Sequence, residues 1–222
     1  MKDNRLGGLA LILGAVSGIV TLTFHPVGGV HRVTPAQFET LIAVVIGVHA
    51  LAITGLPVSF AGAFVLTRRI DSPVRIAFMG LVVYAFGLVS VMAAATMSGL
   101  VIPSLLRETV GHGANDQSRI LIAYTHSLNQ GFARIGAVGF SMAILLWSIA
   151  MFRKRTLPIG LAIYGAMSAI AIIVGIASGR LDSELHGFRI FTLIQAIWFL
   201  LAGAFLWRSS EVDLSKQSTV QA

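Results

Sequence analysis

Cysteine is absent from this chain, and charged residues are scarce. The absence of Cys excludes disulfides, thiolate metal ligands and cysteine nucleophiles. Only 11% of the 222 residues are charged, whereas about a quarter is usual for a soluble domain. With 56% hydrophobic residues and a mean hydropathy of +0.86, the chain carries more apolar surface than a globular core of this size can bury. These proportions predict an integral membrane protein.

The sequence also lacks the motifs of several enzyme and binding classes. It contains no Gly-x-Ser-x-Gly nucleophile motif, no Walker-type loop and no GxGxxG. The HxxxH, HExxH and CxxCH spacings of metal and haem sites do not occur either. The net charge of +7 does not indicate nucleic-acid binding, because the basic residues form short clusters between apolar runs. No catalytic residue can therefore be assigned, and whether the protein is an enzyme stays open.

The apolar runs predict an all-α, polytopic bundle of six transmembrane helices in a single domain. A helix needs about 20 apolar residues to cross the hydrocarbon. Runs of this kind cover residues 6–24, 38–66, 76–106, 119–152, 159–178 and 187–207. Residues 27–35 between the first two runs contain several Gly and Pro, so we expect irregular backbone there. Residues 208–222 form a polar tail.

An even number of spans places both termini on one side of the membrane. Most Lys and Arg residues fall on that side, in the clusters Arg68-Arg69, Arg153-Lys154-Arg155 and near both termini. By the positive-inside rule this side is cytoplasmic. We expect a multi-pass protein of a bacterial-type plasma (inner) membrane, with both termini in the cytoplasm and the lipid bilayer as its constant partner.

A polar stripe leads into the fourth run. At about 100° per residue, Arg119, His126, Gln130, Arg134 and Ser141 fall within an arc of roughly 80°. Polar side chains entering a membrane span are costly unless they face other helices or water. We therefore expect residues 119–134 to form one helix with the span, and His49, His126 and Arg134 to face the interior of the bundle.

Counting back from the cytoplasmic ends places a histidine- and arginine-rich layer on the outer (periplasmic) side. About 20 residues from the cytoplasmic end of four of the spans lies a cationic or imidazole side chain. The members of this layer are His25, His49, Arg134, His186 and Arg189. His49 is the most informative, because its helical neighbours are apolar and a lone imidazole there needs an interior partner. Two interpretations stay open: independent residues that reach the headgroups, or a shared polar cavity.

Binding of a small ligand is one hypothesis for this layer. Arg134 beside Gln130 and His126 offers charge and directional donors for a small solute, including an anionic one. His186 and Arg189 would converge on the same place. The predicted ligand-binding residues are therefore His49, His126, Gln130, Arg134, His186 and Arg189.

A metal or haem site is the alternative. Imidazole binds zinc, copper and iron, and two histidines on facing helices can hold a haem. The candidate ligands are His25, His49 and His126, and the cofactor would be haem or a transition metal, as in a redox subunit.

Two further functions stay open. The chain could be a non-catalytic accessory subunit that needs only lipid-facing and partner-facing helices, with another membrane protein as its partner. It could also act on a lipid or quinone at the outer leaflet, with His126 as a base near Glu108 or Asp116.

Overall fold

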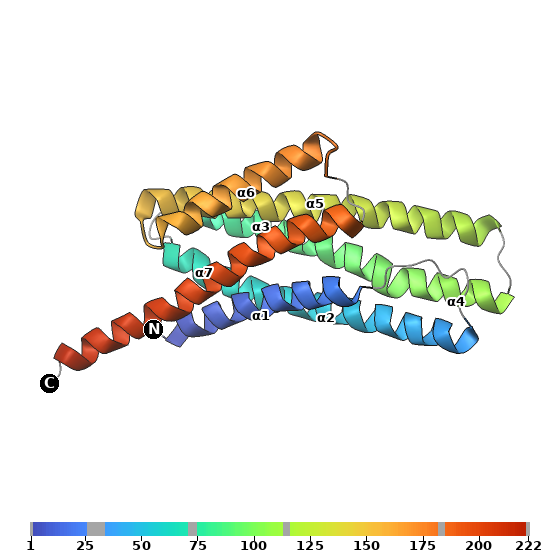
Figure 1. Ribbon diagram of the computed structural model, residues 1–222, viewed down its shortest axis with the longest axis horizontal. Coiled ribbons are helices and arrows are strands. Elements are labelled where there is room, and N and C mark those ends of the chain that lie inside the picture. The colour runs from blue at the N-terminus through green and yellow to red at the C-terminus, as the bar shows by residue number, and fades with distance from the viewer. Residues whose placement is uncertain (1, 26–33, 71–74, 113–115, 182–184, 221–222) are drawn as a thin grey trace.

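The computed structural model describes residues 2–25, 34–70, 75–112, 116–181 and 185–220, and these ranges contain helices and turns but no strand. The helices are α1 (Lys2–Phe24), α2 (Pro35–Ile70), α3 (Arg75–Thr96), the π-helix η1 (Met97–Val101), α4 (Ile102–His112), α5 (Asp116–Lys154), α6 (Ile159–Ala177) and α7 (Leu185–Val220). Because α3, η1 and α4 follow one another without a break, they form one rod (Figure 1). Six rods in the described ranges are long and apolar enough to span a membrane. The predicted all-α class with six spans is confirmed at this level.

The second helix starts earlier than the sequence predicted. The prediction of irregular backbone through residue 35 is wrong at its last position, because Pro35 is the first residue of α2. Thr34 and Gln37 cap this helix reciprocally: the Gln37 amide donates to Thr34 Oγ1 at 3.3 Å, and the Thr34 amide donates to Gln37 Oε1 at 2.9 Å. This is a capping box with proline at the first helical position, where its missing N–H costs nothing.

Two other helices can be compared with the predicted spans. Helix α5 runs without interruption through Gly131, which confirms that the polar stripe and the fourth span are one helix. Helix α7 continues past the expected boundary at residue 207 as far as Val220.

The helices form two groups that face each other. Helix α1 packs against α2 and α7, and α5 packs against α3 and α6, while α2 and α3 join the two groups. The start of α1 and the C-terminal part of α7 lie at the same end of the bundle (Figure 1). At the other end α2, α4 and α5 extend beyond α1 and α7. There the exposed pair Arg107–Glu39, at 2.8 Å, connects α4 to α2.

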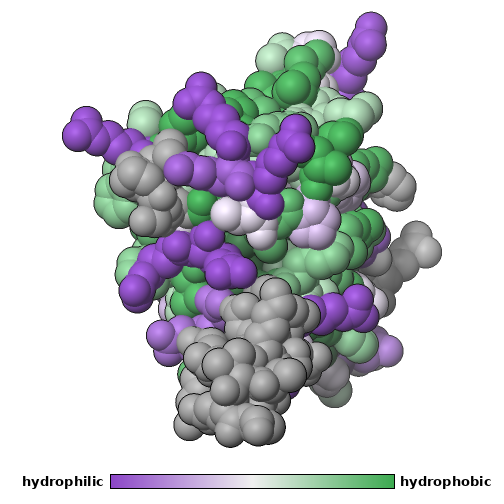
Figure 2. Space-filling view, turned by 90° about the vertical axis from the view of Figure 1, so that its left-hand side faces the viewer, coloured by the Kyte–Doolittle hydropathy of each residue, from purple (hydrophilic) through white to green (hydrophobic). Residues whose placement is uncertain are grey.

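The end that carries the first residues of α1 is strongly basic. Exposed cations gather there at the ends of α2, α5 and α7 and at the start of α3, and Figure 2 shows them as a hydrophilic surface. We call this the basic end; its exposed residues are Arg68, Arg69, Arg75, Arg153, Lys154, Arg155 and Arg208.

A buried aromatic cluster lies near the basic end. Trp147 and Trp198 are both fully buried and stack with centroids 5.8 Å apart. Tyr84 lies against Trp147 at 5.4 Å and against Phe199 at 5.3 Å. The indole N–H of Trp147 donates to Thr67 Oγ1 and to Ala77 O, both at 3.1 Å, so the only polar atom of this ring is satisfied.

Glycines bring the backbones of α1, α2 and α7 together in the same half. A Cβ at Gly8 would lie 2.6 Å from the carbonyl oxygen of Gly203, and a Cβ at Gly62 would lie 2.6 Å from the amide nitrogen of Leu11. Small residues of this kind permit close helix packing inside a membrane. These helices are therefore closely packed in the basic half, and a cavity opens toward the opposite half.

Candidate functional site

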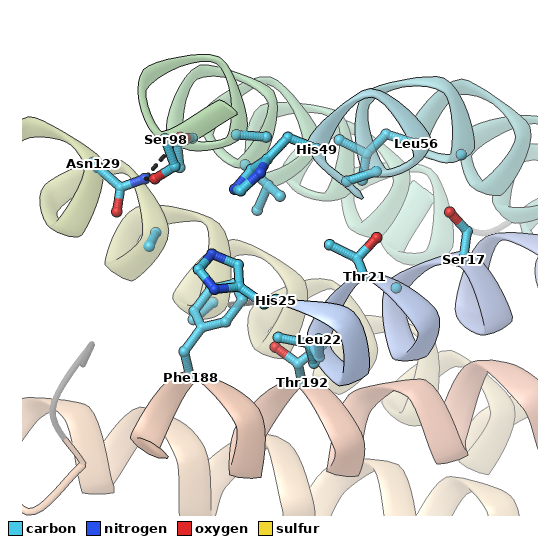
Figure 3. A pocket seen from close by; sticks show the side chains of 18 of the residues that line it. Ser17, Thr21, Leu22, His25, His49, Leu56, Ser98, Asn129, Phe188 and Thr192 are labelled. Carbon is cyan, nitrogen blue, oxygen red and sulfur yellow. Dashed lines mark hydrogen bonds between the residues drawn. The ribbon is translucent and has the colours of Figure 1, made fainter. Parts of the chain in front are cut away.

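A cavity of about 660 Å³ occupies the interior of the bundle away from the basic end. It is lined by α1, α2, α3, η1, α4, α5 and α7, whereas α6 contributes no residue. Ligand pockets in proteins usually measure about 300–1,000 Å³, so its volume suits a single small molecule. Figure 3 shows side chains from α1, α2, η1, α5 and α7 converging on it.

The floor of the cavity is the aromatic core. Tyr84, Phe140 and Phe199 line the cavity and also pack on one another, with Tyr84 5.0 Å from Phe140 between centroids. Ser59 Oγ lies 2.6 Å from Tyr84 Oη in a buried hydrogen bond. One hydroxyl donates to the other, so the pair keeps one hydroxyl hydrogen of its own on an otherwise apolar floor.

Two histidines meet in the upper part of the cavity. His25 follows directly after α1, and His49 lies in the middle of α2 and is only 5% exposed. Their rings are 5.1 Å apart between centroids, with an angle of 70° between the planes, and they point toward one another in Figure 3. His49 Nδ1 lies 2.7 Å from the Val45 carbonyl oxygen. Because a carbonyl only accepts, the proton of the neutral ring sits on Nδ1 and Nε2 is an acceptor.

The π-helix η1 makes room for His49. A side chain at Gly99 would overlap the Cβ and Cγ atoms of His49, so this position admits glycine only. The widened turn also places Ser98 beside α5, where Asn129 Nδ2 donates to Ser98 Oγ at 2.5 Å and to Ala94 O at 2.7 Å. Single π-turns inside α-helices are often found at functional sites.

A buried amide from α7 completes the polar lining. Gln195 is 5% exposed, and its Nε2 donates to Ala137 O at 3.1 Å and to Ser141 Oγ at 2.9 Å. Both bonds cross from α7 to α5, so Gln195 holds together two helices that otherwise have few contacts. The neighbouring Gln130 of α5 also lines the cavity, and its Oε1 is buried with no hydrogen-bond partner among the described residues. A ligand would satisfy that atom.

The lining is electrically neutral. None of the described residues that line the cavity is Asp, Glu, Lys or Arg. Its polar members are hydroxyl, amide and imidazole groups, and the rest of the lining is aliphatic or aromatic. This composition fits an uncharged molecule, because a charge taken out of water requires a compensating partner.

The structure brings some of the predicted site residues together. His25, His49, His126 and Gln130 all line the cavity, although His126 is exposed. Arg189 lies at the same level as His25, since its Nη2 donates to Leu22 O at 3.4 Å, but it is not part of the lining. The side chain of His186 lies outside the described residues.

Arg134 differs from its predicted orientation. Its side chain is exposed and is not part of the lining, so the expectation that it faces the interior is wrong. At about 100° per residue it lies roughly 80° from His126 around α5, whereas the cavity-facing arc is centred near Ala133 and Ala137. A long cationic side chain at the edge of an apolar arc turns outward to solvent or headgroups.

The structure brings two of the three predicted metal ligands together, and the third is not among them. His25 and His49 are adjacent, yet among the described residues no group of three His, Cys, Asp or Glu side chains is placed to hold a metal ion. His126 is therefore not brought into one ligand set with the other two.

Several lining residues were not predicted from the sequence. Ser17, Thr21, Ser98, Asn129 and Gln195 all belong to the site. Gln195 carried a usable signal, because a lone amide inside an apolar span needs an interior partner. The hydroxyl residues carried none, since Ser and Thr in membrane helices commonly bond to their own backbone.

Comparisons with protein-family models, with curated proteins and with solved structures found no match for this chain.

Proposed function

We propose that this protein binds one small, uncharged and largely apolar ligand inside its helical bundle. The membrane is a bacterial-type plasma membrane, the basic end faces the cytoplasm and the cavity belongs to the outer, periplasmic half. The positive-inside rule supports this orientation, because the exposed cations gather at one end.

The observation that carries the proposal is the neutral cavity of about 660 Å³ in the half of the bundle away from the basic end. A chiefly apolar space of this volume, with hydroxyl, amide and imidazole groups in its lining, matches a molecule with an apolar body and a polar group. Along α2 the lining runs from Phe38 to Ser59, which corresponds to about 30 Å of helix. Lipid-like molecules have these proportions.

The same lining disfavours an anionic solute. The two arginines that would have bound an anion, Arg134 and Arg189, are both absent from the lining. An anion in this cavity would have to lose its hydration without gaining a counter-charge among the described lining residues.

A glycine of the lining offers the test. A Cβ at Gly18 would meet nothing within 4 Å, and Gly18 lines the cavity, so Gly18→Phe would fill empty space rather than displace a neighbour. Gly47 on α2 also has nothing within 4 Å, but it is exposed and is not in the lining. Gly47→Phe is therefore the matched control for a bulky residue at a helical glycine.

The neutral fluorophore N-phenyl-1-naphthylamine serves as the probe in lipid nanodiscs. Trp147 and Trp198 lie next to the cavity floor, so tryptophan excitation should transfer energy to a bound probe. We expect strong transfer in the native chain and in Gly47→Phe, and a large loss in Gly18→Phe. Mass spectrometry of small molecules extracted from the purified protein should show the same pattern for a co-purified compound. Equal transfer in all three proteins would contradict the proposal.

A further inference from the structure

Five polar side chains of the cavity lining direct their hydrogens into the protein; they are Ser17, Thr21, His49, Asn129 and Gln195. Two hydroxyls of α1 show this first: Ser17 Oγ donates to Leu51 O at 3.1 Å, and Thr21 Oγ1 donates to Val48 O at 3.4 Å. A hydroxyl has one hydrogen and two lone pairs. Once the hydrogen is bound to a carbonyl of α2, each oxygen can only accept a bond from the cavity.

The imidazole of α2 has the same bias. His49 Nδ1 donates to Val45 O at 2.7 Å, so the neutral ring offers Nε2 as an acceptor. Thr21 bonds to the carbonyl of Val48, the residue before His49, and both Thr21 and His49 belong to the lining.

The two amides complete the set. Asn129 donates both hydrogens of Nδ2, to Ala94 O and Ser98 Oγ, and Gln195 donates both hydrogens of Nε2, to Ala137 O and Ser141 Oγ. One partner of each amide is a backbone carbonyl, which fixes the nitrogen and oxygen assignments chemically. Asn129 Oδ1 and Gln195 Oε1 are left as acceptors, and in Figure 3 the Asn129 oxygen points away from Ser98.

We infer that the ligand is an uncharged amphiphile whose polar end carries a hydroxyl group. This inference rests on the proposed function and specifies its ligand. These five acceptors from α1, α2, α5 and α7 favour a ligand that brings a hydrogen, because a ketone, ester or ether offers them only lone pairs. The hydroxyls of Ser98 and Thr192 can rotate to match the oxygen of such a ligand.

An amine would also bring hydrogens, but it would carry a positive charge at neutral pH. No carboxylate lies among the described lining residues to balance that charge. Long-chain alcohols, sterols, isoprenoid alcohols and quinols are the chemical class that brings a hydrogen without a charge, whereas an oxidised quinone offers these acceptors none.

Dodecan-1-ol and its methyl ether form a matched pair of probes. They share an apolar chain, and only the alcohol has a hydrogen to donate. Each is titrated against N-phenyl-1-naphthylamine bound to the native protein in nanodiscs. We expect the alcohol to displace the fluorophore with an apparent Kd about tenfold lower than that of the ether, which is the size of effect expected from one or two hydrogen bonds in an apolar site.

Two variants place the preference in this lining. Thr21→Val keeps the shape of the side chain and removes its oxygen, and His49→Phe keeps a ring and removes Nε2. Each should reduce the preference for the alcohol, measured as the apparent Kd of the ether divided by that of the alcohol, by about threefold or more. Thr23→Val is the control, because Thr23 is on the same helix, is exposed and bonds to its own helix at Ile19 O. If one variant fails to fold, the other still gives the answer.

The outcomes separate the two proposals. Equal displacement by alcohol and ether, with both lost in Gly18→Phe, would overturn the hydroxyl inference and leave the cavity as a ligand site. A preference for the alcohol that survives both Thr21→Val and His49→Phe would overturn it as well. Absence of any displacement, with Gly18→Phe identical to the native chain, would overturn the proposed function itself.

Discussion

The imidazole rings of His25 and His49 meet edge to face inside the bundle, with 5.1 Å between their centroids. One ring follows the last turn of α1 and the other lies in the middle of α2. Their meeting agrees with the count of about 20 residues along each helix from the basic end, which predicts one depth for both. The pair lies within the cavity, about 15 Å along α2 from Ser59 at its floor.

The absence of native cysteine makes this pair easy to test by cross-linking. We expect the double variant His25→Cys/His49→Cys to be joined by a short bifunctional methanethiosulfonate in nanodiscs, because the two side chains converge. The cross-link is read as the loss of both free thiols and the mass of one added linker. The pair Thr23→Cys/His49→Cys is the control, since Thr23 is exposed. Comparable cross-linking of both pairs would contradict the observed packing.

Sequence reasoning reached this depth but not the direction of every side chain. Hydropathy and the spacing of basic clusters predicted six spans, because a membrane span requires about 20 mostly apolar residues and this pattern stays visible even where single residues are polar. The inward position of His49 was predicted because a lone imidazole among apolar helical neighbours needs an interior partner. These sequence patterns could not predict that Arg134 is exposed. Periodicity gives the angles between residues around one helix, but which side faces the interior depends on how the neighbouring helices pack. The cavity-facing arc of α5 is set by α3 and α7, which pack on it through residues distant in sequence.

The π-helix was also outside the reach of sequence patterns, and Gly99 tests its role. Gly99→Ala would place a methyl group onto the Cβ and Cγ atoms of His49, so we expect a loss of about 1–3 kcal/mol in the free energy of unfolding. Titration with SDS in mixed micelles, followed by tryptophan fluorescence, measures this loss.

The compensating variant identifies the cause of that loss. Gly99→Ala combined with His49→Gly should recover most of the stability lost by Gly99→Ala, relative to His49→Gly alone. Gly131→Ala on α5 is a control, because a Cβ there meets nothing within 4 Å, and we expect it to be neutral or slightly stabilising. Additive effects of Gly99→Ala and His49→Gly would show that the two positions are not in contact.

Asn129 connects α5 to the rod of α3 and η1 at the same level. Its two donated bonds, at 2.7 Å to Ala94 O and 2.5 Å to Ser98 Oγ, join two rods that are long and apolar enough to span a membrane. Interhelical bonds of this kind contribute about 0.5–2 kcal/mol, so Asn129→Leu should reduce the unfolding free energy by that amount. Ser127→Ala, which removes only an exposed bond to Ala123 O of the same helix, should change it by less than about 0.5 kcal/mol. Equal effects of the two substitutions would contradict a bridging role for Asn129.

The closely packed basic half of the bundle should be the last part to unfold, and Thr67 gives access to it. Thr67 is 5% exposed, and its Oγ1 accepts the indole N–H of Trp147, which is fully buried and stacked on Trp198. Thr67→Val keeps the volume and removes that acceptor, while the bond to Ala77 O remains. We expect a loss of about 1 kcal/mol and a shift of the tryptophan emission maximum.

Thr54→Val on the same helix is the matched control, since Thr54 is exposed and bonds only to Ala50 O and Leu51 O of its own helix. Its stability and emission should stay at the native values. A loss in Thr54→Val equal to that in Thr67→Val would mean that the Trp147–Thr67 bond adds nothing to the stability of the aromatic core.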